Sequence, residues 1–190
     1  MPEVDPFRIK TFKTPKEFSK WLEYNHDTEV ELWLKIFKKG SGEESINWEE
    51  AVIEGLCWGW IDGVKKSLDS QAYLQRFTPR RLGSNWSRRN TEHSERLIKE
   101  GRMTEAGLKH IQAAKEDGRW EAAYAPPSEM MIPSDFLSAL EVNLTIKNNF
   151  EALSKTERYH ILYSLHTAKK VETRQRRFKQ FIEMLTIKND

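Results

Sequence analysis

All seven tryptophans of this 190-residue chain precede residue 121, and a proline-containing segment follows them. Ala125-Pro126-Pro127-Ser128, with Pro133 soon after, reads as a linker, because proline interrupts helices and strands alike. Strand and helix patterns alternate before this segment, whereas the patterns after it are helical. We therefore expect an α+β fold: a tryptophan-rich domain at 1–124 with a small mixed sheet packed with helices, a linker at 125–132, and an all-helical module at 133–190.

Within the first domain, local signals predict where most elements begin. Thr14-Pro15-Lys16-Glu17 offers an N-cap, a proline at the first helical position and a capping-box glutamate. Asn47-Trp48-Glu49-Glu50 has a similar pattern and begins a helix expected to run through Cys57. The other predicted elements are strands at 7–12, 30–37, 60–66 and 73–77, the last two forming a hairpin, and helices around 86–99 and 104–116.

Four helices are expected after the linker. Ser154-Lys155-Thr156-Glu157 is another capping box and begins the third of them. Apolar residues at helical spacing mark the buried faces of the four helices. These residues are Phe136, Leu137 and Leu140; Phe150 and Leu153; Ile161, Leu162 and Leu165; and Phe178, Phe181, Ile182 and Leu185.

Two glycines surround a tryptophan and an aspartate where the predicted hairpin begins. Gly59 follows a helix and fits a left-handed position that side chains with a Cβ occupy poorly. Gly63, inside a strand, indicates a bulge or a place where another backbone or a ligand comes close. Trp60 would pack at this corner. Asp62 would either cap a neighbouring backbone or pair with an arginine, for which Arg76 on the partner strand is the candidate. A structural corner and a site-shaping element both fit these residues.

Basic residues gather on the same hairpin, and like charges side by side repel unless acidic groups or an anion lie between them. Two basic blocks, at 65–102 and 155–190, alternate with acidic ones along a chain whose net charge is only +2. The blocks either neutralise each other across the fold or form an anion-binding surface. The candidate anion- or partner-binding residues are Lys65, Lys66, Arg76, Arg80, Arg81 and Trp86.

Catalytic patterns are absent from the sequence. Cys57, the one cysteine, lies in an apolar segment where a buried, inert thiol is expected. The five histidines show no metal-ligand spacing, and no phosphate-cradling glycine loop or nucleophile elbow occurs. We expect no cofactor, no metal and no catalytic residue, so that an enzyme of unknown reaction is only a further alternative.

Several motifs resemble the YdeI/OmpD-associated family, which is labelled bacteriocin-protection. The resemblance covers nearly the whole chain. In order, the motifs are Gly59–Gly63, Lys65–Asp69, Tyr73–Arg81, Trp86-Ser87, Glu100–Thr104, Gly107-Leu108, Asp117–Trp120, Ala123–Pro126, Thr167–Lys170, Glu172–Arg174 and Arg176-Arg177.

This resemblance implies protection against bacteriocins or antimicrobial peptides and an association with an outer-membrane porin, with no established reaction. We therefore expect a non-catalytic stress-protection protein that binds an unknown protein or small anionic partner, and a nucleic-acid-binding protein is the alternative. Homo-oligomerisation stays open. No apolar run is long enough to span a membrane and no export signal is visible, so a cytoplasmic location is expected, although the family is sometimes described as periplasmic.

Overall fold

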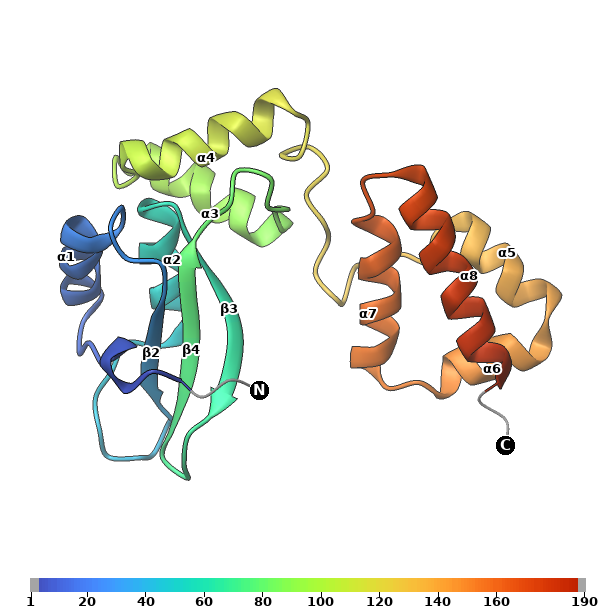
Figure 1. The fold of residues 1–190 in the computed structure, drawn as a ribbon, viewed down its shortest axis with the longest axis horizontal. Coiled ribbons are helices and arrows are strands. Elements are labelled where there is room, and N and C mark those ends of the chain that lie inside the picture. The colour runs from blue at the N-terminus through green and yellow to red at the C-terminus, as the bar shows by residue number, and fades with distance from the viewer. Residues whose placement is uncertain (1–3, 188–190) are drawn as a thin grey trace. The chain divides into compact units, whose positions relative to one another are not determined.

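The computed structural model describes residues 4–187 and has the predicted α+β composition. The chain forms two compact units by packing, one of residues 1–84 with 90–122 and the other of residues 85–89 with 123–190. The elements before residue 123 are a 3₁₀ turn η1 (Pro6–Arg8), β1 (Ile9–Lys10), α1 (Pro15–Asn25), β2 (Leu32–Phe37), α2 (Trp48–Cys57), β3 (Trp60–Ser67), β4 (Ala72–Pro79), α3 (Arg88–Lys99) and α4 (Glu105–Glu116). Those after it are α5 (Ser134–Val142), α6 (Leu144–Ala152), α7 (Lys155–His166) and α8 (Val171–Ile187), so the four predicted helices are confirmed (Figure 1).

The sheet has the strand order β1-β2-β4-β3, with β1 parallel to β2 and the other pairs antiparallel. The hairpin of β3 and β4 therefore confirms the prediction. Helices α1 and α2 cover one face: the ring of Phe18 lies edge-on to that of Phe77, 5.7 Å between centroids, and Trp21 meets Trp60 in the same way at 5.7 Å (Figure 1). These aromatic contacts form the centre of the first unit.

The first predicted strand is much shorter than residues 7–12. Asp5 accepts a hydrogen bond from the Phe7 backbone N–H through its side chain and caps the 3₁₀ turn η1. Only Ile9 and Lys10 are then free to pair, with Trp33 and Leu34 of β2. The predicted helix starts are confirmed, because Thr14 caps α1 and Asn47 and Glu50 form a complete capping box at α2.

The second unit has its own hydrophobic core. Phe136, Phe150 and Leu185 lie at its centre, and the ring of Phe136 contacts that of Phe150 edge-on at 5.7 Å. Asn149 is buried, and its side-chain amide donates to the Leu185 carbonyl at 2.7 Å, which satisfies a polar group that would otherwise be costly to bury. The capping box predicted at Ser154 and Glu157 is present at the start of α7.

A short segment at the start of α3, residues 85–89, completes this second unit. The Tyr124 backbone N–H donates to the Trp86 carbonyl at 3.0 Å, and the Arg88 N–H donates to the Tyr124 carbonyl at 2.9 Å. Ser87 and Tyr124 form a parallel bridge. Met130 and Ile132, inside the segment predicted as a linker, pack on the helical core. The domain limits given above stay a prediction.

Candidate functional site

The corner between α2 and β3 is built around Gly59. This glycine has φ +71°, and a Cβ there would lie 2.8 Å from both the Ala106 carbonyl oxygen and His110 Cδ2. Its own carbonyl accepts from the Arg80 backbone N–H at 2.8 Å, which ties the end of β4 to the corner. The left-handed position predicted for Gly59 is confirmed, and close packing by α4 adds a second reason for glycine.

The bulge predicted at Gly63 is also present, because the register of β3 shifts between Asp62 and Lys65. The Gly63 carbonyl accepts a hydrogen bond from the buried Gln75 side chain at 2.8 Å. A Cβ at Gly63 would make only ordinary van der Waals contact, 3.8 Å from the Arg76 carbonyl oxygen. The bulge therefore serves the sheet and satisfies a buried amide.

The predicted pair between Asp62 and Arg76 is wrong. Asp62 accepts instead from Trp48 Nε1 at 3.0 Å, whereas Arg76 binds Glu31 through Nε and Nη2, each 2.7 Å from the same carboxylate oxygen. Asp62 lies opposite Phe77 in the ladder, so its side chain is on the face covered by α1 and α2. Successive side chains on a strand point to opposite faces, which places Arg76 on the other side.

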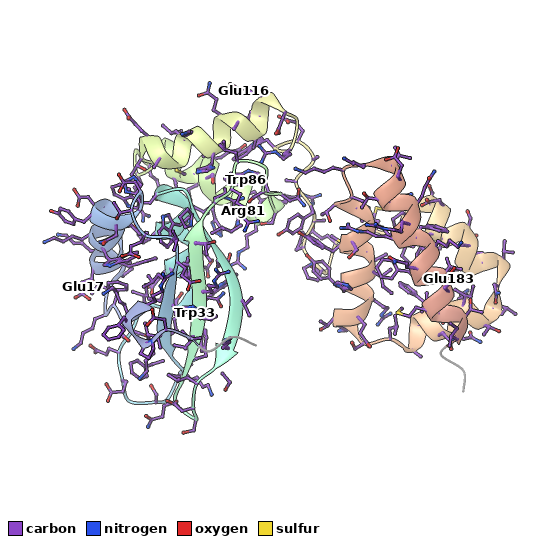
Figure 2. The ribbon with its side chains drawn as sticks, in the orientation of Figure 1. Glu17, Trp33, Arg81, Trp86, Glu116 and Glu183 are labelled. Atoms are coloured by element: carbon purple, nitrogen blue, oxygen red, sulfur yellow. The ribbon has the colours of Figure 1, made fainter. Side chains whose placement is uncertain are left out.

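The same alternation divides the predicted basic residues. Lys66 lies opposite Leu74, and its Nζ sits 5.0 Å from the centroid of the Trp33 ring, so it shares with Arg76 the face opposite α1 and α2. Figure 2 labels Trp33 in the sheet, where it is 6% exposed. Lys65 lies opposite Gln75, on the other face, with its Nζ 3.9 Å from the centre of the Tyr73 ring.

The remaining predicted site residues differ sharply in exposure. Arg80 is only 4% exposed and Trp86 only 2%, whereas Arg81, labelled in Figure 2, is exposed. Phe77 is fully buried, so its ring cannot stack with a base of a nucleic acid. Trp60 is buried at the corner, as expected, and its Nε1 donates a hydrogen bond to the His26 carbonyl. The structure thus brings Lys66 and Arg76 together on one face of the sheet and places Lys65 on the other, whereas Arg80 is buried.

Near the corner, His110 is surrounded by cations. Burial lowers its pKa, and the charges of Arg80, Lys109 and Arg119 lower it further. Within residues 4–187 its buried Nδ1 has no hydrogen-bond partner. Arg119 is anchored by Asp117 at 2.7 Å and by the Ser84 carbonyl at 2.7 Å. This cluster was not predicted, because α4 is far from the hairpin in sequence.

The thiol of Cys57 is buried, and desolvation raises its pKa to about 12, with Glu54 acting in the same direction. A thiol with such a pKa is not a thiolate at neutral pH and is a poor nucleophile. Among the described residues, no group of three or more His, Cys, Asp or Glu side chains could hold a metal ion. No helix in this part of the chain is both long and apolar enough to cross a membrane.

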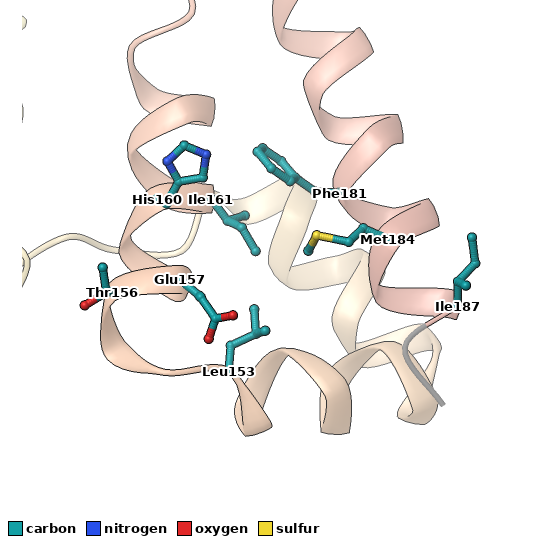
Figure 3. Close-up of a pocket in the computed structure, with 8 residues that line it drawn as sticks. All are labelled: Leu153, Thr156, Glu157, His160, Ile161, Phe181, Met184 and Ile187. Carbon is teal, nitrogen blue, oxygen red and sulfur yellow. The ribbon is translucent and has the colours of Figure 1, made fainter. Parts of the chain in front are cut away.

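A mainly apolar concave surface lies in the second unit, between α7 and α8 (Figure 3). This groove has a volume of about 660 Å³, and Figure 3 shows the His160 and Phe181 rings on facing helices above Ile161 and Met184. Ile161 and Phe181 were predicted as core positions, but their sequence pattern is the same whether a helix face is covered or open. The groove is lined by Leu153, Thr156, Glu157, His160, Ile161, Phe181, Met184 and Ile187.

Two family models match this chain. Residues 10–110, more than half of the chain, match the model described as Domain of unknown function (DUF8412). The chain belongs to that family. Residues 129–186 match a second model, described as Bacteriocin-protection, YdeI or OmpD-Associated (OmdA), which confirms the family resemblance.

The motifs on which that resemblance was based do not all lie in the OmdA segment. Those at 167–177 lie in the OmdA segment, whereas those from Gly59 to Leu108 lie in the DUF8412 segment. The groove of Figure 3, apart from Ile187, also lies in the OmdA segment. No curated protein and no solved structure matches the chain.

Proposed function

We propose that this chain is a non-catalytic bacterial stress protein that protects against bacteriocins by binding them, and that the groove between α7 and α8 receives the peptide. The description of the OmdA family supports the protective role, and the groove supports the binding mode. Many antimicrobial peptides are cationic and amphipathic, and an amphipathic helix binds by laying its apolar face into a groove of this kind. A cytoplasmic location is part of this proposal.

The observation that carries the proposal is exposed apolar surface at the groove. Met184 and Ile187 are 42% and 74% exposed on α8, one turn apart, beside Phe181. Contiguous exposed apolar surface of this kind is typical of interaction sites. Glu157 lies at the edge of the groove and is suited to a cationic side chain of the peptide.

A labelled helical peptide of leucine and lysine is a suitable probe, titrated by fluorescence anisotropy. Met184→Glu places a charge in the groove and is expected to weaken binding at least about tenfold, since burying one such side chain contributes about 1.5–3 kcal/mol. Val171→Glu is the matched control, because Val171 is also exposed on α8 and does not line the groove. Equal loss in both variants, or none in either, would contradict the groove as the binding site. Expression of the wild type and Met184→Glu in a bacteriocin-sensitive strain then tests the protective role itself.

A second candidate function is binding of an anionic partner, nucleic acid included, on the face of the sheet opposite α1 and α2. The observation that favours it is an ordered set of cations there: Lys66 over Trp33, Lys35 with its Nζ 4.6 Å from the Phe37 ring centroid, and Arg76. Lysines held over aromatic faces are positioned before a ligand arrives.

Sulfate is the probe for this second function. It is expected to raise the melting temperature of the wild type, and the double change Lys35→Gln with Lys66→Gln should remove that shift. Lys65→Gln is the control, because Lys65 lies on the opposite face. For a DNA duplex, log affinity should fall against log salt with a slope of about −0.9 for each phosphate contacted. A sulfate response that survives in the double variant argues against this surface.

A further inference from the structure

A second hollow in the helical unit has a different chemistry from the groove of Figure 3. It has a volume of about 530 Å³ and shares no lining residue with that groove, although α7 contributes to both. This volume lies within the range of small-molecule sites. Its lining residues are Pro127, Ser128, Ile132, Phe150, Lys155, Arg158, Tyr159 and Leu162.

One face of α7 supplies the polar half of this hollow. Lys155, Arg158, Tyr159 and Leu162 follow one another at i, i+3, i+4 and i+7, so their side chains lie on one side of the helix. Leu162 is buried, whereas Arg158 and Tyr159 are half-buried and Lys155 is exposed. The polar half of the hollow thus consists of the cations Lys155 and Arg158 and the phenol of Tyr159, next to the apolar Leu162.

The other half of the hollow is apolar. Phe150 is buried, and Ile132 is half-buried and packs on the helical core. Pro127 completes this side and comes from the segment before α5. A site with a large apolar part and a few polar groups at one end is typical of pockets for small ligands.

The two cations are not neutralised within the described part of the chain. Neither Lys155 nor Arg158 has an ion pair or a side-chain hydrogen bond there. Two other arginines of the same unit have partners: Arg174 binds Asp135 at 2.6 Å, and Arg177 donates to the Ser164 carbonyl at 2.7 Å. Burial raises the pKa of Tyr159, and its neighbour Tyr163 adds to this, so the phenol stays neutral and can donate a hydrogen bond.

We propose that this hollow, called here the Arg158 pocket, binds a small organic anion that has an apolar body and a single carboxylate or phosphate head. The apolar body lies on Ile132, Phe150 and Leu162. The head is held by the planar guanidinium of Arg158, which fits either group bidentately, with Lys155 and the Tyr159 hydroxyl beside it. This proposal is independent of the peptide-binding groove.

Three probes with the same phenyl group separate the contributions of charge and apolar surface: 3-phenylpropanoate, 2-phenylethyl phosphate and the neutral 3-phenylpropan-1-ol. Binding to the full chain is followed by titration in ¹H–¹⁵N correlation spectra. At least one of the two anions is expected to give saturable shifts at Ile132, Phe150 and Tyr159, and to bind at least about tenfold more tightly than the alcohol. The stronger of the two anions identifies the head group.

The variants test the assigned roles. Arg158→Gln is expected to weaken the better anion about tenfold, and Arg158→Lys, which keeps the charge without the fork, should weaken it less. Lys155→Gln should show a smaller loss than Arg158→Gln. Arg176→Gln is the matched control, since Arg176 is exposed on α8 and lines neither hollow. The proposal would be overturned if neither anion bound, if the saturable shifts were confined to other residues, or if the alcohol bound with equal affinity. It would also be overturned if inorganic phosphate competed fully, or if Arg158→Gln and Arg176→Gln lost equal affinity.

Discussion

Arg102 lies beyond the end of α3 and holds the buried carboxylate of Glu54 in α2, with its Nη2 2.6 Å from Glu54 Oε1. Burial raises the pKa of Glu54 above its ordinary value of 4.5, and the charge of Arg102 opposes this rise. The pair therefore joins α2 to the loop after α3 at a position where a carboxylate alone would be costly.

We expect Arg102→Met to destabilise the fold in a pH-dependent way. The folded-state pKa of Glu54 would rise further, so folded Glu54 would bind its proton more tightly than the unfolded chain does, and stability would be lost as pH rises above about 4.5. Urea unfolding should show a cost of about 2 kcal/mol at pH 7 and little at pH 4, a typical figure for an unpaired buried group. Arg96→Met, which removes an exposed pair with Glu100 at 3.7 Å, is the control and should cost little at either pH. If Arg102→Met lowered the free energy of unfolding by the same amount at pH 4 and pH 7, Arg102 would stabilise the fold by packing alone.

Gly59→Ala should lower the free energy of unfolding by more than the left-handed backbone conformation alone accounts for. Gly101 has a similar φ of +68° but open space around it, so Gly101→Ala measures the conformational term, about 1 kcal/mol. At Gly59 the added Cβ also meets Ala106 and His110, and we expect about 3 kcal/mol in urea unfolding. Similar costs for the two alanines would show that α4 gives way easily at the corner.

Arg80 and Arg81 are neighbours in the sequence, yet we expect alanine to change the free energy of unfolding by different amounts at the two positions. Arg81 is exposed, so Arg81→Ala should change the free energy of unfolding by no more than about 0.5 kcal/mol. Arg80 is buried next to His110, and Arg80→Ala should cost about 2 kcal/mol by leaving a cavity and disturbing buried polar groups. Equal melting temperatures for the two variants would indicate that the Arg80 site reorganises at no cost.

Cys57 should resist a thiol reagent in the native protein. Its pKa of about 12 leaves little thiolate at pH 8, and burial blocks the approach of the reagent. Labelling with an aromatic disulfide is expected to be slow in buffer and complete in concentrated urea. Fast labelling of the folded chain would reveal local opening of the end of α2.

Local signals in the sequence predicted the helix starts and the hairpin well. Thr14, Asn47 and Ser154 cap helices through contacts within one turn, which a short stretch of sequence contains in full. The partner of Arg76 could not be predicted in this way. It depends on the register of β2 against β4, which brings Glu31, far from Arg76 in sequence and just before β2, beside Arg76.

The two hollows of the helical unit were not predictable from periodicity. Phe181 and Met184 follow the same helical spacing as fully buried residues, and only the positions of neighbouring helices decide which face stays open. The same holds for Arg158, whose charge in the sequence gives no sign that the described chain leaves it without an acidic partner.

The hydrogen bond from the Tyr124 backbone N–H to the Trp86 carbonyl has a consequence for the order in which the chain is made. During synthesis the segment 85–89 leaves the ribosome well before the helices with which it packs, so the second unit is completed only when its last helix has been made. A gene fragment that starts at the proline segment would encode the helices without the segment 85–89. Transfer of this unit to another protein would therefore require two separate pieces of sequence.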